Sequence, residues 1–142
     1  MKRLTMNLMI AAAALAAVAG SASAQTLKAD IPFTFHAGGA LLSPGTYQVK
    51  MNSTNGAPIF ILQNADTGKA SMVGEYASGD APKAWTANGA ARLAFECAGS
   101  RCVLRSVYQG GDAPAHHLSG PKFGPNEEVH TAEVRMTSLK AD

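Results

Sequence analysis

ARLAFECAGSRCVLRSVY, residues 91–108, is the stretch that decides the fold class of this chain. Two apolar segments flank four residues rich in small and turn-forming types, a pattern typical of a β-hairpin. Because side chains alternate along a strand, Phe95 and Cys97 share one face of the first strand, and Cys102 and Leu104 share one face of the second. We therefore predict a hairpin in which a four-residue loop sets Cys97 opposite Cys102.

The rest of the chain beyond residue 24 repeats short alternating segments separated by glycine and proline. This punctuation is typical of an all-β protein, and a long helix is not expected. With the hairpin, further strands are predicted at residues 30–36, 46–51, 59–62, 69–76 and 129–137. About seven strands in mostly sequential hairpins predict a single small antiparallel β-barrel or β-sandwich.

Several segments carry more specific expectations. Four consecutive apolar residues at 59–62 indicate a strand covered on both faces, and Ser-Pro-Gly at 43–45 indicates a reverse turn. Two long irregular loops are predicted at 77–89 and 109–128, because both are rich in glycine and proline. Trp85 is the only large residue of the first loop, and we expect it to tack that loop to the core.

The first 24 residues have the three parts of a secretory signal peptide. Residues 2 and 3 are basic, residues 8–18 are apolar, and Ala-Ser-Ala at 22–24 suits signal peptidase. Cleavage then leaves a β domain over residues 25–142, located in the periplasm or the extracellular medium. The apolar run falls short of the roughly twenty residues that span a bilayer, and no cysteine at the junction could carry a lipid. We therefore expect no membrane anchor.

The charge balance argues against nucleic acid as a partner. The whole chain has 12 Lys and Arg against 10 Asp and Glu, and two of the basic residues are Lys2 and Arg3. The predicted mature domain therefore has equal numbers of basic and acidic residues, scattered along its length. Such a domain lacks the positive surface that binds a phosphate backbone.

Both cysteines lie in the part predicted to be exported, where disulfides form and persist. A bond across so short a ring stabilises by only about 2 kcal/mol on the loop-entropy estimate, so it would mainly fix the hairpin register. The redox-active spacing C-x-x-C is tighter than the spacing here. We predict a structural disulfide between Cys97 and Cys102; free or reactive thiols and a metal site remain the alternatives.

The N-terminal part of the predicted domain carries a family resemblance. Residues 29–35 read ADIPFTF and residues 42–47 read LSPGTY. They resemble the run Asp-Ile-Pro-Phe-x-Phe, then Leu-Pro-Ala-Gly-Thr-Tyr, of a family of small exported bacterial proteins of unknown function. The resemblance covers residues 29–50 and implies a β meander. Here the proline stands one place later, and the cysteines flank a hairpin that the family builds without a disulfide. The resemblance implies no activity, cofactor or catalytic residue.

His116 and His117 are the most suggestive chemical groups, since they adjoin in a predicted loop with His130 not far along the chain. Neighbouring side chains on an extended backbone diverge, so a metal site would need His130, or Asp112 with Glu127 or Glu128, to converge by folding. No spacing such as H-E-x-x-H enforces this. We expect solvated loop histidines, and we keep a metal-binding protein or a hydrolase built on these histidines as the alternative.

Local catalytic motifs are missing from the sequence. No G-x-S-x-G run is present, and the adjacent Glu127 and Glu128 would face opposite sides of a strand. We expect no cofactor and consider an enzyme the less favoured class, although a site assembled from distant loops would leave no motif.

By elimination, the expected function is that of a non-catalytic binding or interaction module of the cell envelope. Its partner would be another envelope protein or a small apolar ligand. Small barrels are commonly filled by their own side chains, so docking of a protein through the long loops or an open sheet edge is favoured.

Overall fold

The computed structural model describes residues 26–53 and 56–139. The signal peptide predicted over residues 1–24 lies outside these ranges. Ten strands and one short helix follow one another along the described chain: β1 (Leu27–Ile31), β2 (Phe35–Ala37), β3 (Ala40–Leu42), β4 (Gly45–Asn52), β5 (Ile59–Asn64), β6 (Ala70–Gly79), α2 (Lys83–Thr86), β7 (Arg92–Ala98), β8 (Arg101–Tyr108), β9 (Ala115–Leu118) and β10 (His130–Ser138). The all-β prediction is confirmed.

Eight of these strands close into an antiparallel barrel. Around the ring the order is β1, β4, β5, β6, β9, β8, β7 and β10, and β10 pairs with β1 again. The barrel is therefore the correct one of the two predicted architectures. The predicted count of about seven strands is too low, because β2, β3 and β9 are only three or four residues long and lie in segments that resemble turns or loops.

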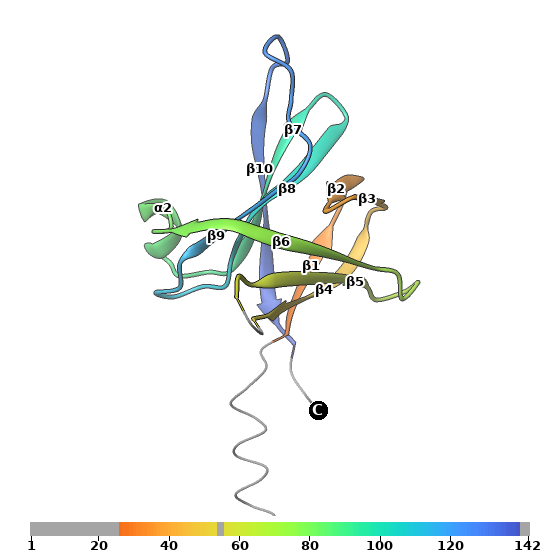
Figure 1. Ribbon diagram of the computed structural model, residues 1–142. Helices are drawn as coiled ribbons and strands as arrows, with labels where there is room; N and C mark the ends of the chain where they lie inside the picture. Colours follow the sequence, from red (N-terminus) through yellow and green to blue (C-terminus); the bar gives the residue numbers. More distant parts are fainter. Residues whose placement is uncertain (1–25, 54–55, 140–142) are drawn as a thin grey trace, which may run out of the picture.

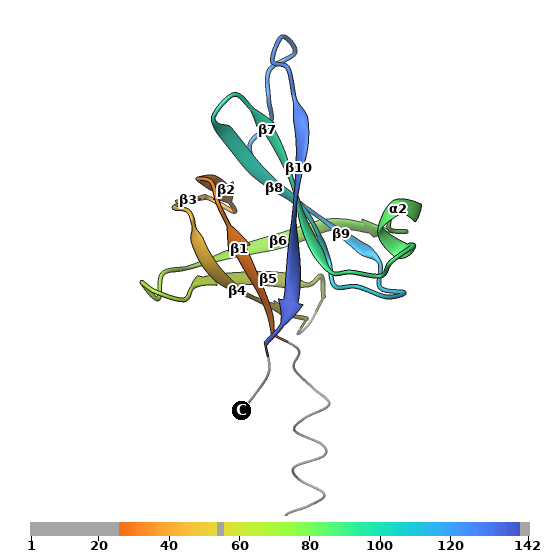
Figure 2. The same ribbon diagram turned by 180° about the vertical axis from the view of Figure 1, so that it is seen from behind.

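The order of strands around the barrel departs from the order along the chain at two crossings. The connection from β6 to β7 passes β9 and β8 and contains α2, and the connection from β9 to β10 passes β8 and β7. Figures 1 and 2 show these connections well apart, with α2 at one side of the molecule and the loop before β10 at its top. The two predicted long loops are these crossings, but the first includes the last residues of β6 and the second includes β9.

The hairpin of β2 and β3 continues the hairpin of β1 and β4 beyond a bend. Ile31 pairs with Gly45 and Phe35 pairs with Leu42, so residues 32–34 and 43–44 face each other across the bend. Two sequence predictions are corrected here: residues 30–36 are not one strand, and residues 43–45 bend the chain rather than reverse it. Pro32 and Pro44 explain the interruption, since neither can donate to the ladder.

This second hairpin folds onto strands β6 and β8. His36 pairs with Val103 in a parallel bridge, and the Ser71 hydroxyl donates to the Ala37 carbonyl oxygen at 2.8 Å. The turn between β2 and β3 requires glycine at position 38, where φ is +64°. The Cβ of any other residue there would lie 2.5 Å from the Met72 carbonyl oxygen. The hairpin therefore covers the barrel where β6 and β8 are not joined by the short β9.

Apolar side chains from the barrel strands and the β2–β3 hairpin fill the interior. The bulkiest fully buried ones include Phe35, Tyr47, Phe60 and Phe95. The strand at 59–62 is buried on one face only, because Ile59 is 41 % exposed while Phe60 is buried. The prediction of cover on both faces is wrong: a single barrel wall has one apolar side, and no second layer covers β5.

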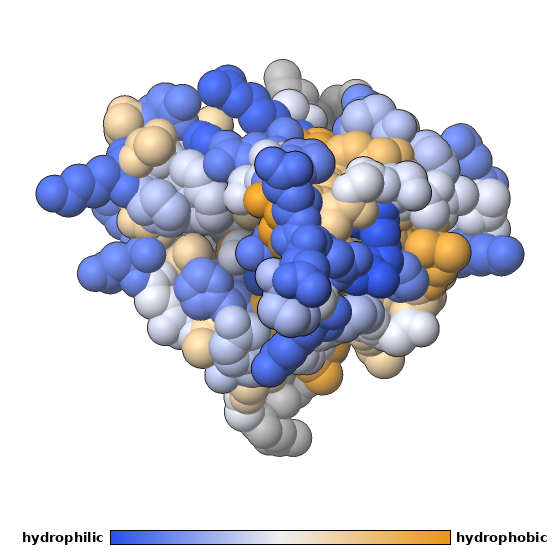
Figure 3. Space-filling model, turned by 90° about the horizontal axis from the view of Figure 1, so that it is seen from above, coloured by the Kyte–Doolittle hydropathy of each residue, from blue (hydrophilic) through white to orange (hydrophobic). Residues whose placement is uncertain are grey.

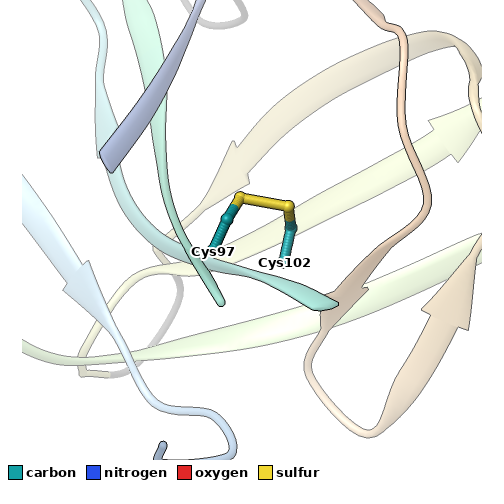
Figure 4. The surroundings of a disulfide bond; sticks show 2 residues. All are labelled: Cys97 and Cys102. Atoms are coloured by element: carbon teal, nitrogen blue, oxygen red, sulfur yellow. A yellow bond between two sulfur atoms is a disulfide. The ribbon is translucent and has the colours of Figure 1, made fainter. Parts of the chain in front are cut away.

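The cysteine hairpin has the predicted register. Cys97 pairs with Cys102, and a disulfide joins them (Figure 4). The loop is shorter than predicted, since Ala98 also pairs with Arg101 and only Gly99 and Ser100 make the turn. Both cysteines are buried in the barrel core beside Phe95 and Leu104. The described chain contains no free cysteine.

A second, smaller cluster lies outside the barrel under α2. Trp85 is buried against Tyr108, Ala94 and Ala115, so it anchors its segment as predicted, but to this separate cluster and not to the main core. Its indole N–H donates to Glu133, and the other carboxylate oxygen of Glu133 accepts from Arg92 at 2.9 Å. These contacts hold the first crossing against β7, β8 and β10.

Candidate functional site

The structure places His116 and His117 on strand β9, not in a solvated loop. His116 pairs with Val107 and His117 with Ser106, so the two rings lie on opposite faces of the barrel wall. The predicted loop position was wrong because residues 115–118 form a short strand between the edges of β6 and β8. The prediction that the two side chains diverge is confirmed.

His116 points into the barrel and meets a glutamate there. Its Nδ1 lies 2.5 Å from Oε1 of Glu75 on β6, and both side chains are at least nine-tenths buried. The Phe60 ring packs beside the imidazole, with centroids 5.1 Å apart. This is an acid and base pair enclosed among apolar side chains, and every buried polar side-chain atom of the described residues has a hydrogen-bond partner.

His117 and His130 lie apart from this pair. His117 faces outward, its Nδ1 lies 3.1 Å from Ser106 Oγ, and its ring lies near that of Tyr76. His130 begins β10 opposite Cys97, toward the tip of the cysteine hairpin. Within residues 26–53 and 56–139, no group of three or more His, Cys, Asp or Glu side chains is placed to hold a metal ion. The three histidines are therefore not brought together.

The outward face of the same wall carries a groove of about 820 Å³. Tyr76 of β6, Glu96 of β7, Arg105 of β8 and His117 of β9 form its floor, while residues 118–120 and 122–124 and Val129 border it. The crossing from β9 to β10 thus supplies one side and four barrel strands supply the other. A volume of this size lies within the range of small-molecule and short-peptide sites, about 300–1,000 Å³.

Two arginines and a phenylalanine fasten the crossing to the barrel. The guanidinium groups of Arg101 and Arg105 both lie over the Phe123 ring, at 4.7 and 5.6 Å from its centroid. Arg105 donates to Glu96 at 2.6 Å and to the Pro121 carbonyl oxygen. Arg101 makes a two-oxygen contact with Glu127, whose carboxylate also accepts from the Gly124 N–H. A segment rich in proline and glycine is thereby held in one position, which keeps the groove open.

The groove combines aromatic and polar groups. Tyr76 is 71 % exposed, and no ion pair of Lys122 occurs among the described residues. Arg105 and Glu96 compensate each other's charge at the floor. Such a lining suits a ligand with both an apolar part and polar or acidic groups, and it offers little to a purely apolar one.

The end of the molecule that is uppermost in Figure 1 lacks a broad apolar face. Figure 3 shows this end as hydrophilic surface interrupted by separate apolar patches. Scattered exposed apolar residues are ordinary on protein surfaces and do not mark a docking site by themselves.

Sequence reasoning missed the residues that build the groove. Tyr76, Arg105 and Phe123 were not singled out, because they meet only after β6, β8 and the second crossing come together. The available signal was Phe123 itself, a lone aromatic residue in a long Gly/Pro-rich segment, comparable with Trp85 in the first crossing. No protein-family model, curated protein or solved structure matches this chain.

Proposed function

We propose that this chain is an exported, non-catalytic β domain that acts as a binding or interaction module of the cell envelope. The observation that carries the proposal is the groove between the β9–β10 crossing and the barrel wall. Its border is fastened by Arg101, Phe123 and Arg105, while Tyr76 remains exposed within it. Binding surfaces are commonly built from loops held by a rigid scaffold.

The partner that fits this groove is a segment of another envelope protein. An apolar ligand inside the barrel is disfavoured, because the large side chains of Phe35, Tyr47, Phe60 and Phe95 occupy the interior. In the groove, an extended peptide would meet aromatic surface at Tyr76 and Phe123 and a positive charge at Lys122. A peptide with an acidic residue next to an apolar one would complement both.

Export rests on the N-terminal sequence, and a disulfide is compatible with it. The described part of the chain contains no helix of the length and apolarity needed to cross a membrane. One measurement tests processing and the disulfide together: intact-mass analysis of the exported protein without reductant. We expect a chain that begins at Gln25 and is two hydrogen masses lighter than the reduced form. A chain that retains Met1 would contradict export, and an unchanged mass on reduction would contradict the disulfide.

Site-specific photo-crosslinking tests the groove as the docking site. A photoreactive phenylalanine analogue at Tyr76 should give a discrete crosslinked product in cells that export the protein. Met72 is the matched control, since it lies on the same strand with a similar exposure of 64 % and does not line the groove. The analogue at Met72 should give no such product.

A second variant separates loss of the groove from loss of the fold. Phe123→Ala removes the ring that both arginines contact, and we expect it to abolish the crosslink while the thermal unfolding transition stays cooperative. Equal crosslinking from Tyr76 and Met72, or an undiminished product in Phe123→Ala, would show that the groove is not the docking site.

A further inference from the structure

One edge of strand β10 is open over half of its length. On one side β10 pairs with β7 from His130 to Arg135. On the other side it pairs with β1 only from Met136 to Ser138. Between His130 and Arg135, no strand of the described chain pairs with β10 on this second side. The barrel is thus closed at the C-terminal end of β10 and has a free edge near its beginning.

The hydrogen bonds show which residues face this edge. The Met136 N–H donates to Ala91 on the β7 side, whereas the Leu139 N–H donates to Thr26 on the β1 side. Backbone groups point alternately to the two sides of a strand. Thr131 and Glu133 are separated from Leu139 by even numbers of residues, so their N–H and C=O groups point to the same side as those of Leu139. That side is the free edge. No strand of the described chain other than β7 pairs with Thr131 or Glu133.

We propose that this edge pairs with the same edge of a second copy of the chain, and that a two-fold axis passes between the two Ala132 residues. In this register Thr131 lies opposite the partner's Glu133, and Glu133 lies opposite the partner's Thr131. The two pairs exchange four backbone hydrogen bonds and join the two barrel walls into one continuous sheet.

The sequence of the edge favours this register over the one centred on Glu133. Moving the axis to Glu133 would set two glutamates directly opposite each other, which is unfavourable. At the proposed axis the residues are alanines, whose side chains are small enough for the close approach of a non-hydrogen-bonded pair. The proposal is independent of the groove, which lies on the outward face of β6 to β9.

The first test measures the mass of the chain in solution as a function of concentration, by sedimentation velocity. We expect the native protein to shift from one chain to two. Thr131→Pro removes an N–H that points away from β7, and prolines are tolerated at such edges. It should raise the dimer dissociation constant by roughly tenfold or more, because two bonds per dimer are lost. Thr131→Val keeps the N–H and should dimerise like the native protein.

The second test reads the register and does not depend on Thr131→Pro folding well. Directly opposite residues of a non-hydrogen-bonded pair have Cα atoms about 4.5 Å apart, which is within the range of disulfides. Ala132→Cys should therefore give a covalent dimer under oxidising conditions. Thr131→Cys is the control, because its opposite residue is the partner's Glu133, and it should crosslink much less.

Either of two results would overturn the proposal. A native protein that stays a single chain up to millimolar concentration would show that no second copy occupies the edge, even if a different protein does. Equal crosslinking of Ala132→Cys and Thr131→Cys in a dimeric protein would show that the copies meet in another way.

Discussion

Replacing Phe35 by alanine is expected to lower the free energy of unfolding by about 3–5 kcal/mol, the usual cost of removing a fully buried phenylalanine. Phe35 is 0 % exposed, and its ring packs edge-to-face against Tyr47 and Phe95, at centroid distances of 5.3 and 5.4 Å. These two contacts join the β2–β3 hairpin to β4 and to β7. The free energy of unfolding of a small domain is only about 5–15 kcal/mol. The expected loss is therefore a large fraction of it.

Urea denaturation followed by tryptophan fluorescence measures this loss, since Trp85 is the only tryptophan. Phe33→Ala is the matched control. Phe33 also packs edge-to-face on Phe95, at 5.0 Å, but lies in the bend between β1 and β2 and is only partly buried. We expect a clearly smaller loss for this variant. Equal losses would mean that the fully buried Phe35 ring contributes no more to stability than the partly buried Phe33 ring.

The local features of the fold were predictable because they depend on neighbours in sequence. The period-two alternation of Phe95 and Cys97 against Cys102 and Leu104 correctly predicted the hairpin, its register and the buried disulfide. The choice between barrel and sandwich was not predictable. It depends on β9 joining β6 to β8, a pairing set by the two crossings and not by any pattern within the strands.

The candidate sites were less predictable than the fold for the same reason. Ala-His-His-Leu at 115–118 resembles a loop, because glycine and proline precede and follow it. One signal was present. His116 and Leu118 are two residues apart, so on a strand their side chains share one face, and the imidazole would lie on the apolar face with Leu118. Its partner Glu75 is 41 residues away and lies beside an irregularity in the β6–β9 register, which no sequence spacing indicates.

The pair of Glu75 and His116 is expected to give the second large effect. Each side chain satisfies the other inside the barrel, so Glu75→Leu or His116→Leu leaves one polar group without its partner. The expected loss is about 1–3 kcal/mol for a neutral hydrogen-bonded group and about 3–5 kcal/mol when a buried ion pair is broken. Urea denaturation at neutral pH measures this loss.

The double variant Glu75→Leu/His116→Leu shows whether the hydrogen-bonded pair raises the free energy of unfolding above that of an apolar interior. Both polar groups then leave together, and the new side chains adjoin the apolar Phe60 and Leu118. Replacing a whole buried pair by apolar residues of similar volume is often neutral or stabilising, so we expect the double variant to be more stable than either single variant. Glu75→Gln, which keeps an acceptor for the imidazole N–H, should lose less than Glu75→Leu. If the two single losses simply add in the double variant, the side chains do not interact, and the hydrogen bond between them is not what holds His116 inside the barrel.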